Sequence, residues 1–423
     1  MRFNLITKPD VLVNGKFYKW PSRPVVVVCI DGGDPEYLNQ YKGKGIIPNI
    51  EKMISQGFSA IADGTMPSFT CPNNMSIITG TPSSIHGISG NYYLDTSTWK
   101  PVVMTGPELL RGDTVLAKFA EAGARVVSIT AKDKLNKQLS KGLSPSSSQI
   151  FFSSEYASEC SLEKNGIENV LDLVKMPQPE IYSMDLSLFV LEAGVKILKD
   201  KSPNLMYLSL TDWVQHKFSP NDEEAIIFYR KLDEYFGQFL DAGALLALTA
   251  DHGMSDKSNE KGEPNVIWLQ DHLDSIFGEG KLQVICPITD AYVGHHGSLG
   301  GFVRVWRREY VSDLELIKSI QALDGVEACY DKNRACQLFD LPLDREADIV
   351  VIAKKNYCLG SSQSAHHLDG LAGHRLRSHG GISEALVPFI LSQKLNEKYR
   401  YKSIAGNIKT HEIFDYVLNG VSN

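Results

Sequence analysis

Short runs of consecutive apolar residues alternate with amphipathic segments along most of the chain. Residues 25–30 (VVVVCI) are apolar at every position, which is typical of a strand buried on both faces of a sheet. Similar runs predict further strands at residues 125–130, 205–210, 244–250 and 387–391. The residues between these runs predict helices at residues 49–56, 75–80, 117–122, 185–199 and 223–240. This alternation predicts an α/β fold with a largely parallel central sheet flanked by helices.

The pattern changes between residues 258 and 370. Short strands are expected at residues 302–306 and 347–353, and a helix is expected at residues 314–322. We therefore predict that residues 258–370 form a smaller α+β unit with a sheet of its own, the cap unit.

The rest of the chain is predicted to form one catalytic core part. It would combine residues 1–257 with residues 371–423, so the cap unit would be an insertion. The polar residues 1–24 and the serine-rich residues 140–165 are expected to be surface segments.

Composition is that of a soluble globular protein, with 43% hydrophobic and 22% charged residues among 423. A net charge of −7 argues against a general nucleic-acid binder, so an anionic substrate would need metal ions or a few lysines. The N-terminus lacks the apolar centre of a signal peptide, and no run approaches the ~18 apolar residues of a membrane span. Seven scattered cysteines without a CxxC motif are typical of reduced thiols in a cytoplasmic protein.

Acidic residues and histidines follow three of the predicted buried strands. They are Asp31, Asp212 with His216, and Asp251 with His252. Each of these residues alone could equally be a helix cap or half of a surface pair. Open α/β sheets bind ligands at the carboxyl ends of their strands, and the repetition at three strand ends favours a common site.

The other histidines do not directly follow a predicted buried strand. His379 precedes two glycines, which would let it approach a crowded metal site. His295-His296 and His366-His367 lie in predicted loops of the cap unit. We expect these four to be solvated or hydrogen-bonded instead of binding metal.

A hydroxyl residue, Thr70, lies between turn-forming residues in the segment MPSFTCPNN. The following proline disfavours helical backbone at Cys71, so Cys71 is not expected in the body of a helix. Asn73 and Asn74 are expected to cap a helix that begins at Met75. This would place Thr70 near a helix N-terminus, where a nucleophile could meet a phosphoryl group, although Thr-x-Pro-Asn is also a common turn.

Two lysines, Lys132 and Lys134, follow the predicted strand at residues 125–130. In an extended segment they would share a face and could bind one anion. Solvated surface lysines are the alternative.

The candidate ligands comprise three carboxylates and three imidazoles, together with the hydroxyl of Thr70. This set exceeds what one tetrahedral zinc ion needs but suits two ions that share a substrate oxygen. Mixed nitrogen and oxygen ligands favour Zn²⁺, with Mn²⁺ or Fe²⁺ as substitutes, and the imidazoles argue against Mg²⁺ or Ca²⁺.

Taken together, these motifs resemble the alkaline phosphatase superfamily, in particular its nucleotide pyrophosphatase/phosphodiesterase branch. The resemblance is carried by Thr70-Cys71-Pro72-Asn73, Thr79-Gly80, His86-Gly87 and the order of the acidic residues and histidines. Over about residues 25 to 395 it extends to the members that hydrolyse phosphonoacetate. The motifs shared with those members are residues 69–74, Gly90-Asn91-Tyr92, and residues 130–135, 286–290 and 376–381. The resemblance implies an alkaline-phosphatase-like fold.

The resemblance also implies roles for individual residues. One zinc ion would be held by Asp31, Thr70, Asp251 and His252. The other would be held by Asp212, His216 and His379. Lys132 and Lys134 would bind the substrate carboxylate, and Asn91 would bind a phosphonate oxygen.

The implied reaction cleaves the C–P bond of phosphonoacetate into acetate and phosphate through a phosphorylated Thr70. The lysines would neutralise the charge that develops on the departing acetate. The sulfatase branch uses a modified cysteine two residues before a proline, but Thr70 occupies that position here, so Cys71 is not expected to be the nucleophile.

Two alternative functions remain open at the level of sequence. One is a phosphodiesterase or phosphomonoesterase of the same superfamily, and the other is a metal-dependent binding or sensor protein. A small-molecule phosphonate is the expected partner, without nucleic acid or membrane, and a homodimer is one of the open oligomeric states.

Overall fold

The computed structural model describes residues 8–288, 297–371 and 373–422. Among these residues, no helix combines the length and the apolar character needed to cross a membrane. All seven cysteines are free thiols.

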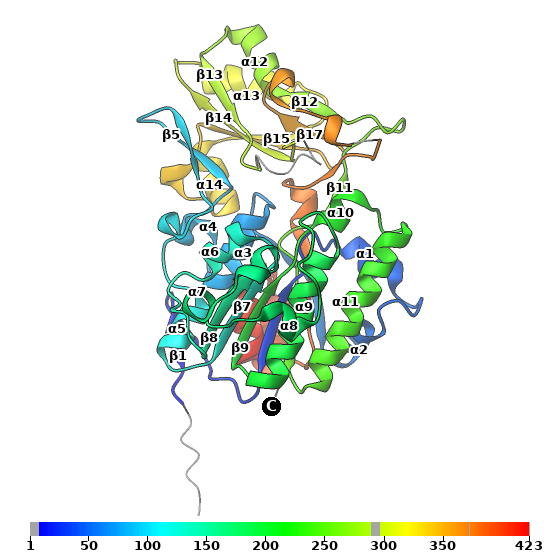
Figure 1. Ribbon diagram of the computed structural model, residues 1–423. Coiled ribbons are helices and arrows are strands. Elements are labelled where there is room, and N and C mark those ends of the chain that lie inside the picture. The colour runs from blue at the N-terminus through cyan, green and yellow to red at the C-terminus, as the bar shows by residue number, and fades with distance from the viewer. Residues whose placement is uncertain (1–7, 289–296, 372, 423) are drawn as a thin grey trace, which may run out of the picture.

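A seven-stranded sheet forms the centre of the larger part of the molecule (Figure 1). Its spatial order is β4 (Phe58–Asp63), β19 (Leu386–Leu391), β10 (Leu245–Thr249), β3 (Val25–Cys29), β9 (Leu205–Ser209), β7 (Val126–Thr130) and β8 (Gln149–Ser153). The strands from β10 to β8 are parallel, whereas β19 is antiparallel to both of its neighbours. The predicted α/β class with a largely parallel sheet is therefore confirmed.

Helices cover both faces of this sheet. The longer ones and those near the site are α1 (Pro35–Tyr41), α2 (Pro48–Gln56), α3 (Thr70–Thr79), α5 (Val115–Glu121), α6 (Asp133–Leu139), α9 (Asp185–Lys201), α10 (Trp213–Lys217) and α11 (Glu223–Asp241). The remaining ones are α4 (Ser83–His86), α7 (Leu162–Asn165), α8 (Val170–Val174), α15 (Glu397–Ala405) and α16 (Ile413–Asp415).

Alternate residues of the central strand β3 pack on opposite faces, as the two-residue period of a strand requires. Val28 belongs to an apolar cluster with Phe189 of α9 and Phe228 of α11. Its neighbour Val27 belongs to the cluster on the other face, with Phe119 of α5. Because both faces are covered by helices, β3 is buried at all of its positions, as its unbroken apolar run predicts.

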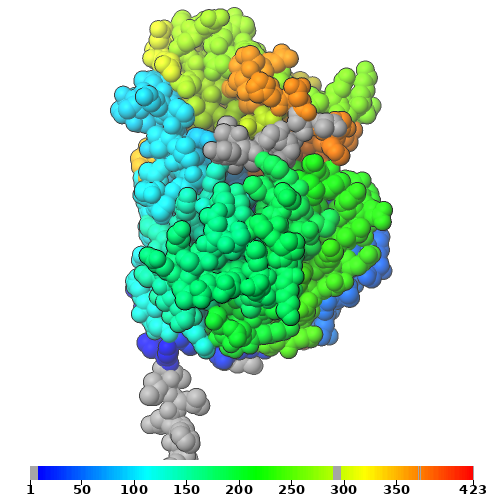
Figure 2. All heavy atoms as spheres, in the orientation of Figure 1, coloured from blue at the N-terminus to red at the C-terminus, as the bar shows by residue number. Residues whose placement is uncertain are grey.

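A second sheet lies within the predicted cap unit, in the upper part of Figure 1. It is antiparallel and has the order β13 (Leu282–Ile285), β14 (Phe302–Arg307), β16 (Ile349–Ala353) and β15 (Val326–Asp331). Its helices are α12 (Leu269–Phe277), α13 (Asp313–Gln321) and α14 (Lys332–Phe339). Figure 2 shows this sheet unit stacked on one end of the larger part. The boundaries at residues 258 and 370 stay predictions.

Four two-stranded pairings complete the fold. They join β1 (Val11–Val13) to β2 (Lys16–Tyr18), β5 (Tyr92–Asp95) to β6 (Lys100–Val103), β11 (Ser255–Asp256) to β18 (Arg377–Ser378), and β12 (Val266–Trp268) to β17 (Cys358–Gly360).

Two predictions of surface segments need correction. Residues 140–165 contain β8, in which Ile150 and Phe152 are buried, so this segment supplies an edge strand of the main sheet. The apolar run of β8 is short and has serines on both sides, so the segment as a whole has the composition of a loop. The predicted lead-in likewise contains the β1–β2 hairpin, which buries Val13 and Tyr18.

Candidate metal and phosphoryl-transfer site

Three carboxylates lie just past the ends of three neighbouring parallel strands. Asp31 follows β3, Asp212 follows β9 and Asp251 follows β10. The registers of these strands align Cys29 with Ser209 and with Thr249, so their carboxyl ends form one edge. The sheet therefore brings together side chains that are up to 220 residues apart, as the recurrence at strand ends predicted.

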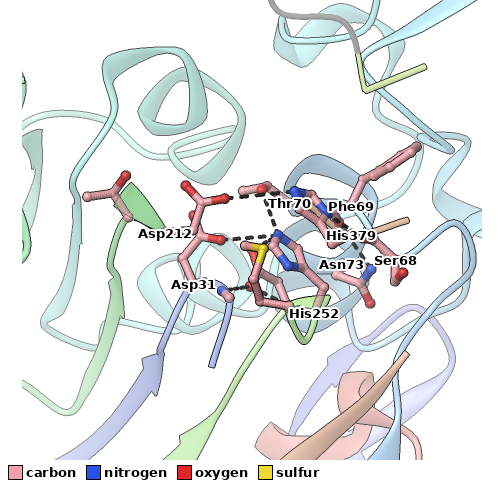
Figure 3. A network of polar contacts seen from close by, with 12 residues as sticks. Asp31, Ser68, Phe69, Thr70, Asn73, Asp212, His252 and His379 are labelled. Carbon is pink, nitrogen blue, oxygen red and sulfur yellow. Dashed lines mark hydrogen bonds and ion pairs between the residues drawn. The ribbon is translucent and has the colours of Figure 1, made fainter. Parts of the chain in front are cut away.

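Three histidines lie close to these carboxylates, and Figure 3 shows two of them, His252 and His379, beside Asp31 and Asp212. The Nε2 atom of His216 lies 2.9 Å from Oδ2 of Asp212, and that of His379 lies 3.8 Å from the same oxygen. The Nε2 atom of His252 lies 3.2 Å from Oδ1 of Asp31. The rings of His252 and His379 stack with 3.5 Å between their centroids. The six residues thus form one cluster, in which Asp212 is partly exposed and the other five are buried.

A backbone carbonyl group fixes each of these imidazole rings. The Nδ1 atoms of His216, His252 and His379 lie 2.7, 2.8 and 2.8 Å from the carbonyl oxygens of Arg377, Gly253 and Ser68, respectively. A carbonyl oxygen only accepts hydrogen bonds, so each Nδ1 carries a hydrogen and donates it. In the neutral ring this leaves the Nε2 lone pair directed at the carboxylates, which is the arrangement of metal-binding histidines.

Burial and mutual repulsion shape the charges in this cluster. Burial, together with Asp212 and Asp251, raises the pKa of Asp31 well above its usual range. Burial opposes ionisation of Asp212 as well, but the neighbouring His216 holds the pKa of Asp212 well below its usual range. Burial disfavours a charged His252, yet Asp251 and Asp31 raise its pKa to about 10. A positive charge placed among these carboxylates, such as that of a metal ion, would therefore be stabilised by them.

The donor atoms fit metal ions. Two groups of side chains have ligand atoms within 4.8 Å of one another, namely Asp31 with Asp251 and His252, and Asp212 with His252 and His379. The buried Oδ1 atom of Asp31 makes no hydrogen bond among the described residues but lies 3.2 Å from the Nε2 atom of His252, so both atoms face the position that one cation could occupy. The second group differs from the ligand set that the resemblance implies for the second zinc ion. It contains His252 where the resemblance implies His216.

Thr70 lies beside this cluster, with its Oγ1 atom 3.2 Å from Nε2 of His252. It is the first residue of α3, which begins five residues earlier than predicted and includes Cys71. The prediction was wrong because a proline within the first helical turn forfeits no intrahelical hydrogen bond. Thr70 nevertheless occupies a helix N-terminus, as the sequence indicated.

Asn73 and Asn74 were predicted to cap this helix. Instead, both lie inside it. Asn73 donates hydrogen bonds to the carbonyl groups of Thr65 and Phe69, at 2.9 and 3.1 Å, and so holds the corner before the helix. Asn74 donates to Oδ2 of Asp251 at 3.1 Å.

Asn74 is therefore a site residue that the sequence prediction missed. Its Oδ1 atom accepts hydrogen bonds from the hydroxyl groups of Tyr207 and Ser209, so its amide group is oriented toward Asp251. It stands four residues after Thr70, on the same face of the helix, and this spacing is the signal that could have identified it.

The thiol of Cys71 lies beside the cavity that Thr70 lines but is held by another side chain. It donates a hydrogen bond to Oε1 of Gln138 at 2.7 Å, and burial raises its pKa to about 12. A thiol with a raised pKa is a poor nucleophile. This supports the prediction that Thr70, and not Cys71, is the reactive residue.

This cavity, of about 550 Å³, opens over Thr70 and the metal-ligand cluster. The predicted substrate-binding residues Asn91, Lys132 and Lys134 line it, together with Asp31, Thr70, Asp212, His216 and His379. The prediction that the two lysines lie in one extended segment was wrong, because α6 begins at Asp133 between them. Both nevertheless reach the same cavity.

Further residues of the cavity wall were not predicted. Several are aromatic or apolar, among them Tyr156, Ile181, Tyr182, Trp213 and Ile288, and others, such as Gln138 and Glu155, are polar. The Nζ atom of Lys132 lies 5.3 Å from the centre of the Tyr182 ring, so this ring stabilises the ammonium group. The backbone N–H of Asn91 donates to the carbonyl of Pro287 at 2.8 Å, which attaches Asn91 to the predicted cap unit.

The other paired histidines do not join the cluster where they are described. The Nδ1 atom of His366 lies 2.8 Å from the carbonyl oxygen of Gly297, and its Nε2 accepts the N–H of Ser361 at 3.0 Å. The predicted hydrogen-bonded role of His366 is thus confirmed. His295-His296, and residues 289–290 of one predicted motif, lie outside the described residues.

Comparison with known proteins shows the family. The family of type I phosphodiesterases / nucleotide pyrophosphatases matches residues 25–380. The chain belongs to this family. An uncharacterized pyrophosphatase/phosphodiesterase of Schizosaccharomyces pombe is 23% identical over 58% of the chain, and human ectonucleotide pyrophosphatase/phosphodiesterase family member 1 is 25% identical over 60%. The matched regions are 47% and 26% of the length of these two relatives.

Solved structures include a relative of the same size. The phosphonoacetate hydrolase of Sinorhizobium meliloti, in complex with phosphonoacetate, is 40% identical, with a TM-score of 0.92 over 99% of this chain and 100% of that one. Murine ectonucleotide pyrophosphatase / phosphodiesterase 5, in complex with AMP, has 16% identity and a TM-score of 0.61 over 95% and 96%, which shows the shared fold. The predicted alkaline-phosphatase-like fold and the resemblance to phosphonoacetate hydrolases are confirmed.

Proposed function

We propose that this chain hydrolyses the C–P bond of phosphonoacetate to give acetate and phosphate. The observation that carries the proposal is the full-length likeness, at 40% identity, to a phosphonoacetate hydrolase. The cavity supports it, because Lys132 and Lys134 line the same cavity as Thr70 and members of the metal-ligand cluster. A substrate with a phosphonate at one end and a carboxylate at the other matches this distribution of groups.

We infer that the cluster holds two divalent ions, Zn²⁺ or, as substitutes, Mn²⁺ or Fe²⁺. One would be held by Asp31, Thr70, Asp251 and His252, and the other by Asp212, His216 and His379. The convergence of Asp31 Oδ1 with the inward-facing Nε2 atoms supports this assignment. When bound, such ions stabilise negative charge on phosphoryl oxygens and favour ionisation of a nearby hydroxyl group.

The side chains of the cavity then have distinct tasks. The oxygen of Thr70 attacks phosphorus and forms a P–O bond, while the P–C bond breaks and its electron pair passes to the departing acetate. Lys132 and Lys134 hold the acetate carboxylate, so they stabilise the charge that spreads onto it in the enediolate form. Asn91 donates an amide N–H to a phosphonate oxygen.

The protons balance over the two steps. The hydroxyl proton of Thr70 passes to solvent when its oxygen attacks, and the departing acetate carbon takes a proton from solvent. One water molecule then attacks phosphorus of the phosphorylated Thr70, which releases phosphate and returns a proton to the Thr70 oxygen. Each turnover therefore consumes one water molecule and yields one acetate and one phosphate.

A phosphodiesterase of the same family is the second candidate, favoured by the family match and by the curated relatives. The test compares release of acetate and phosphate from phosphonoacetate with cleavage of a nitrophenyl phosphodiester by the same metal-loaded protein. Equal amounts of acetate and phosphate, formed faster than nitrophenol, support the proposal. Cleavage of the diester alone would contradict it.

We also propose that the partner is a small-molecule phosphonate, without nucleic acid or membrane, and that the location is cytoplasmic. The free state of all seven cysteines supports the location, because thiols stay reduced in the cytoplasm.

A further inference from the structure

Ser68 joins the segment that carries Thr70 to the segment that carries His379 (Figure 3). Its hydroxyl group donates a hydrogen bond to the carbonyl of Gly381 at 2.8 Å and accepts the N–H of Gly380 at 3.0 Å. Its backbone carbonyl accepts the Nδ1 hydrogen of His379, with 2.8 Å between the two atoms. One fully buried serine thus makes three hydrogen bonds to three consecutive residues.

The two segments also touch without intervening space. Gly380 has a φ of +117°, and a Cβ atom at this position would lie 2.3 Å from the ring of Phe69. The same ring meets His379 edge-on, with 5.6 Å between the ring centroids. Since closely packed groups transmit displacements, a shift of either segment must move the other.

We propose that Ser68 is a positioning residue that sets the distance between the Thr70 oxygen and the Nε2 atom of His379. The inference rests on the proposed function, in which these two atoms act on one phosphoryl group. The hydroxyl group of Ser68 holds the backbone on both sides of Gly380, and its carbonyl fixes the orientation of the His379 ring. Partners of this kind around a metal ligand affect metal affinity or activity by about 10- to 100-fold.

The variant Ser68→Ala tests the proposal, because it removes two of the three hydrogen bonds and leaves the carbonyl in place. Metal-stripped protein is titrated with Zn²⁺ against a coloured chelator, and kcat and KM for phosphonoacetate are measured at saturating Zn²⁺. We expect affinity for one of two zinc ions to fall by about 10-fold, and kcat to fall with little change in KM.

A matched control separates positioning from a general loss of stability. Ser83 is also fully buried, and its hydroxyl group donates to the carbonyl of Ile88 at 2.9 Å. Ser83→Ala should lower the melting temperature of the metal-free protein as Ser68→Ala does, yet leave Zn²⁺ affinity and kcat unchanged. Ser68→Ala with wild-type affinity and kcat would overturn the proposal.

Two further outcomes are also decisive. If Ser68→Ala does not fold, Ser68→Cys takes its place, since it keeps a weaker hydrogen-bonding atom at the same position. Its Zn²⁺ affinity should lie below that of the wild type, and equal affinity would overturn the proposal. A wild-type protein that binds Zn²⁺ but leaves phosphonoacetate intact would contradict the proposed function, while the affinities would still decide the role of Ser68.

Discussion

The Oγ1 atom of Thr70 lies 3.2 Å from the Nε2 atom of His252, although 182 residues separate them in the chain. The same Nε2 atom lies 3.2 Å from Oδ1 of Asp31. A hydroxyl group, an imidazole and a carboxylate therefore meet at one point on the edge of the sheet. This is the arrangement that a metal-assisted nucleophile requires.

Removal of the Thr70 hydroxyl group should abolish turnover while the fold survives. We expect Thr70→Ala to lower kcat for phosphonoacetate by at least about a thousandfold, because no other group can form the phosphorylated intermediate. The melting temperature and Zn²⁺ content should stay near those of the wild type. Thr70→Ser, which keeps a hydroxyl group, should retain measurable activity. An alanine variant with unchanged turnover would exclude Thr70 as the nucleophile.

Lys132 should matter most when the leaving group is poor. We expect Lys132→Ala to lower kcat for phosphonoacetate by about 100-fold or more, and kcat for a nitrophenyl phosphomonoester by less than about 10-fold. The reason is that nitrophenolate departs without help, whereas the acetate enediolate does not. Lys137→Ala is the control, since Lys137 lines the same cavity but forms an ion pair with Asp133. Equal losses on both substrates would mean that Lys132 only binds.

The buried His86 should make folding sensitive to acid. Burial lowers its pKa to about 3, and its Nδ1 atom accepts the N–H of Ile88 at 3.1 Å, which requires the neutral ring. In the unfolded chain the pKa is about 6.5, so between these two pH values the unfolded state binds more protons. The contribution of His86 to stability is therefore complete above pH of about 6.5 and is lost as the pH falls.

This group alone should change the free energy of unfolding by up to about 1.4 kcal/mol per pH unit in that range. Urea unfolding of metal-free protein at several pH values measures the slope. His86→Gln, which remains neutral, should be less stable at neutral pH and show a shallower slope below it. Identical slopes for both proteins would show that His86 titrates alike in the folded and unfolded states.

Much of this site follows from local sequence signals. Asp31, Asp212 and Asp251 each stand after a short apolar run, and parallel topology alone brings such positions together. The position of Lys132 after a strand left a solvated lysine open, and nothing local marked Asn91, so a resemblance to known enzymes was needed to assign both to the substrate.

Other features depend on contacts that no local pattern encodes. Asn74 acts on Asp251 across 177 residues, and Ser68 acts on His379 across 311. The helix start at Thr70 was misplaced because a proline near a helix start is equally compatible with a turn and with a first helical turn.

The most direct test of the central claim is the anomalous scattering of crystals grown with Zn²⁺, measured on both sides of the zinc absorption edge. We predict two peaks, one among Asp31, Asp251 and His252 beside the Thr70 oxygen, and one among Asp212, His216 and His379. Zinc peaks that avoid these side chains, in a protein that still hydrolyses phosphonoacetate, would contradict the account.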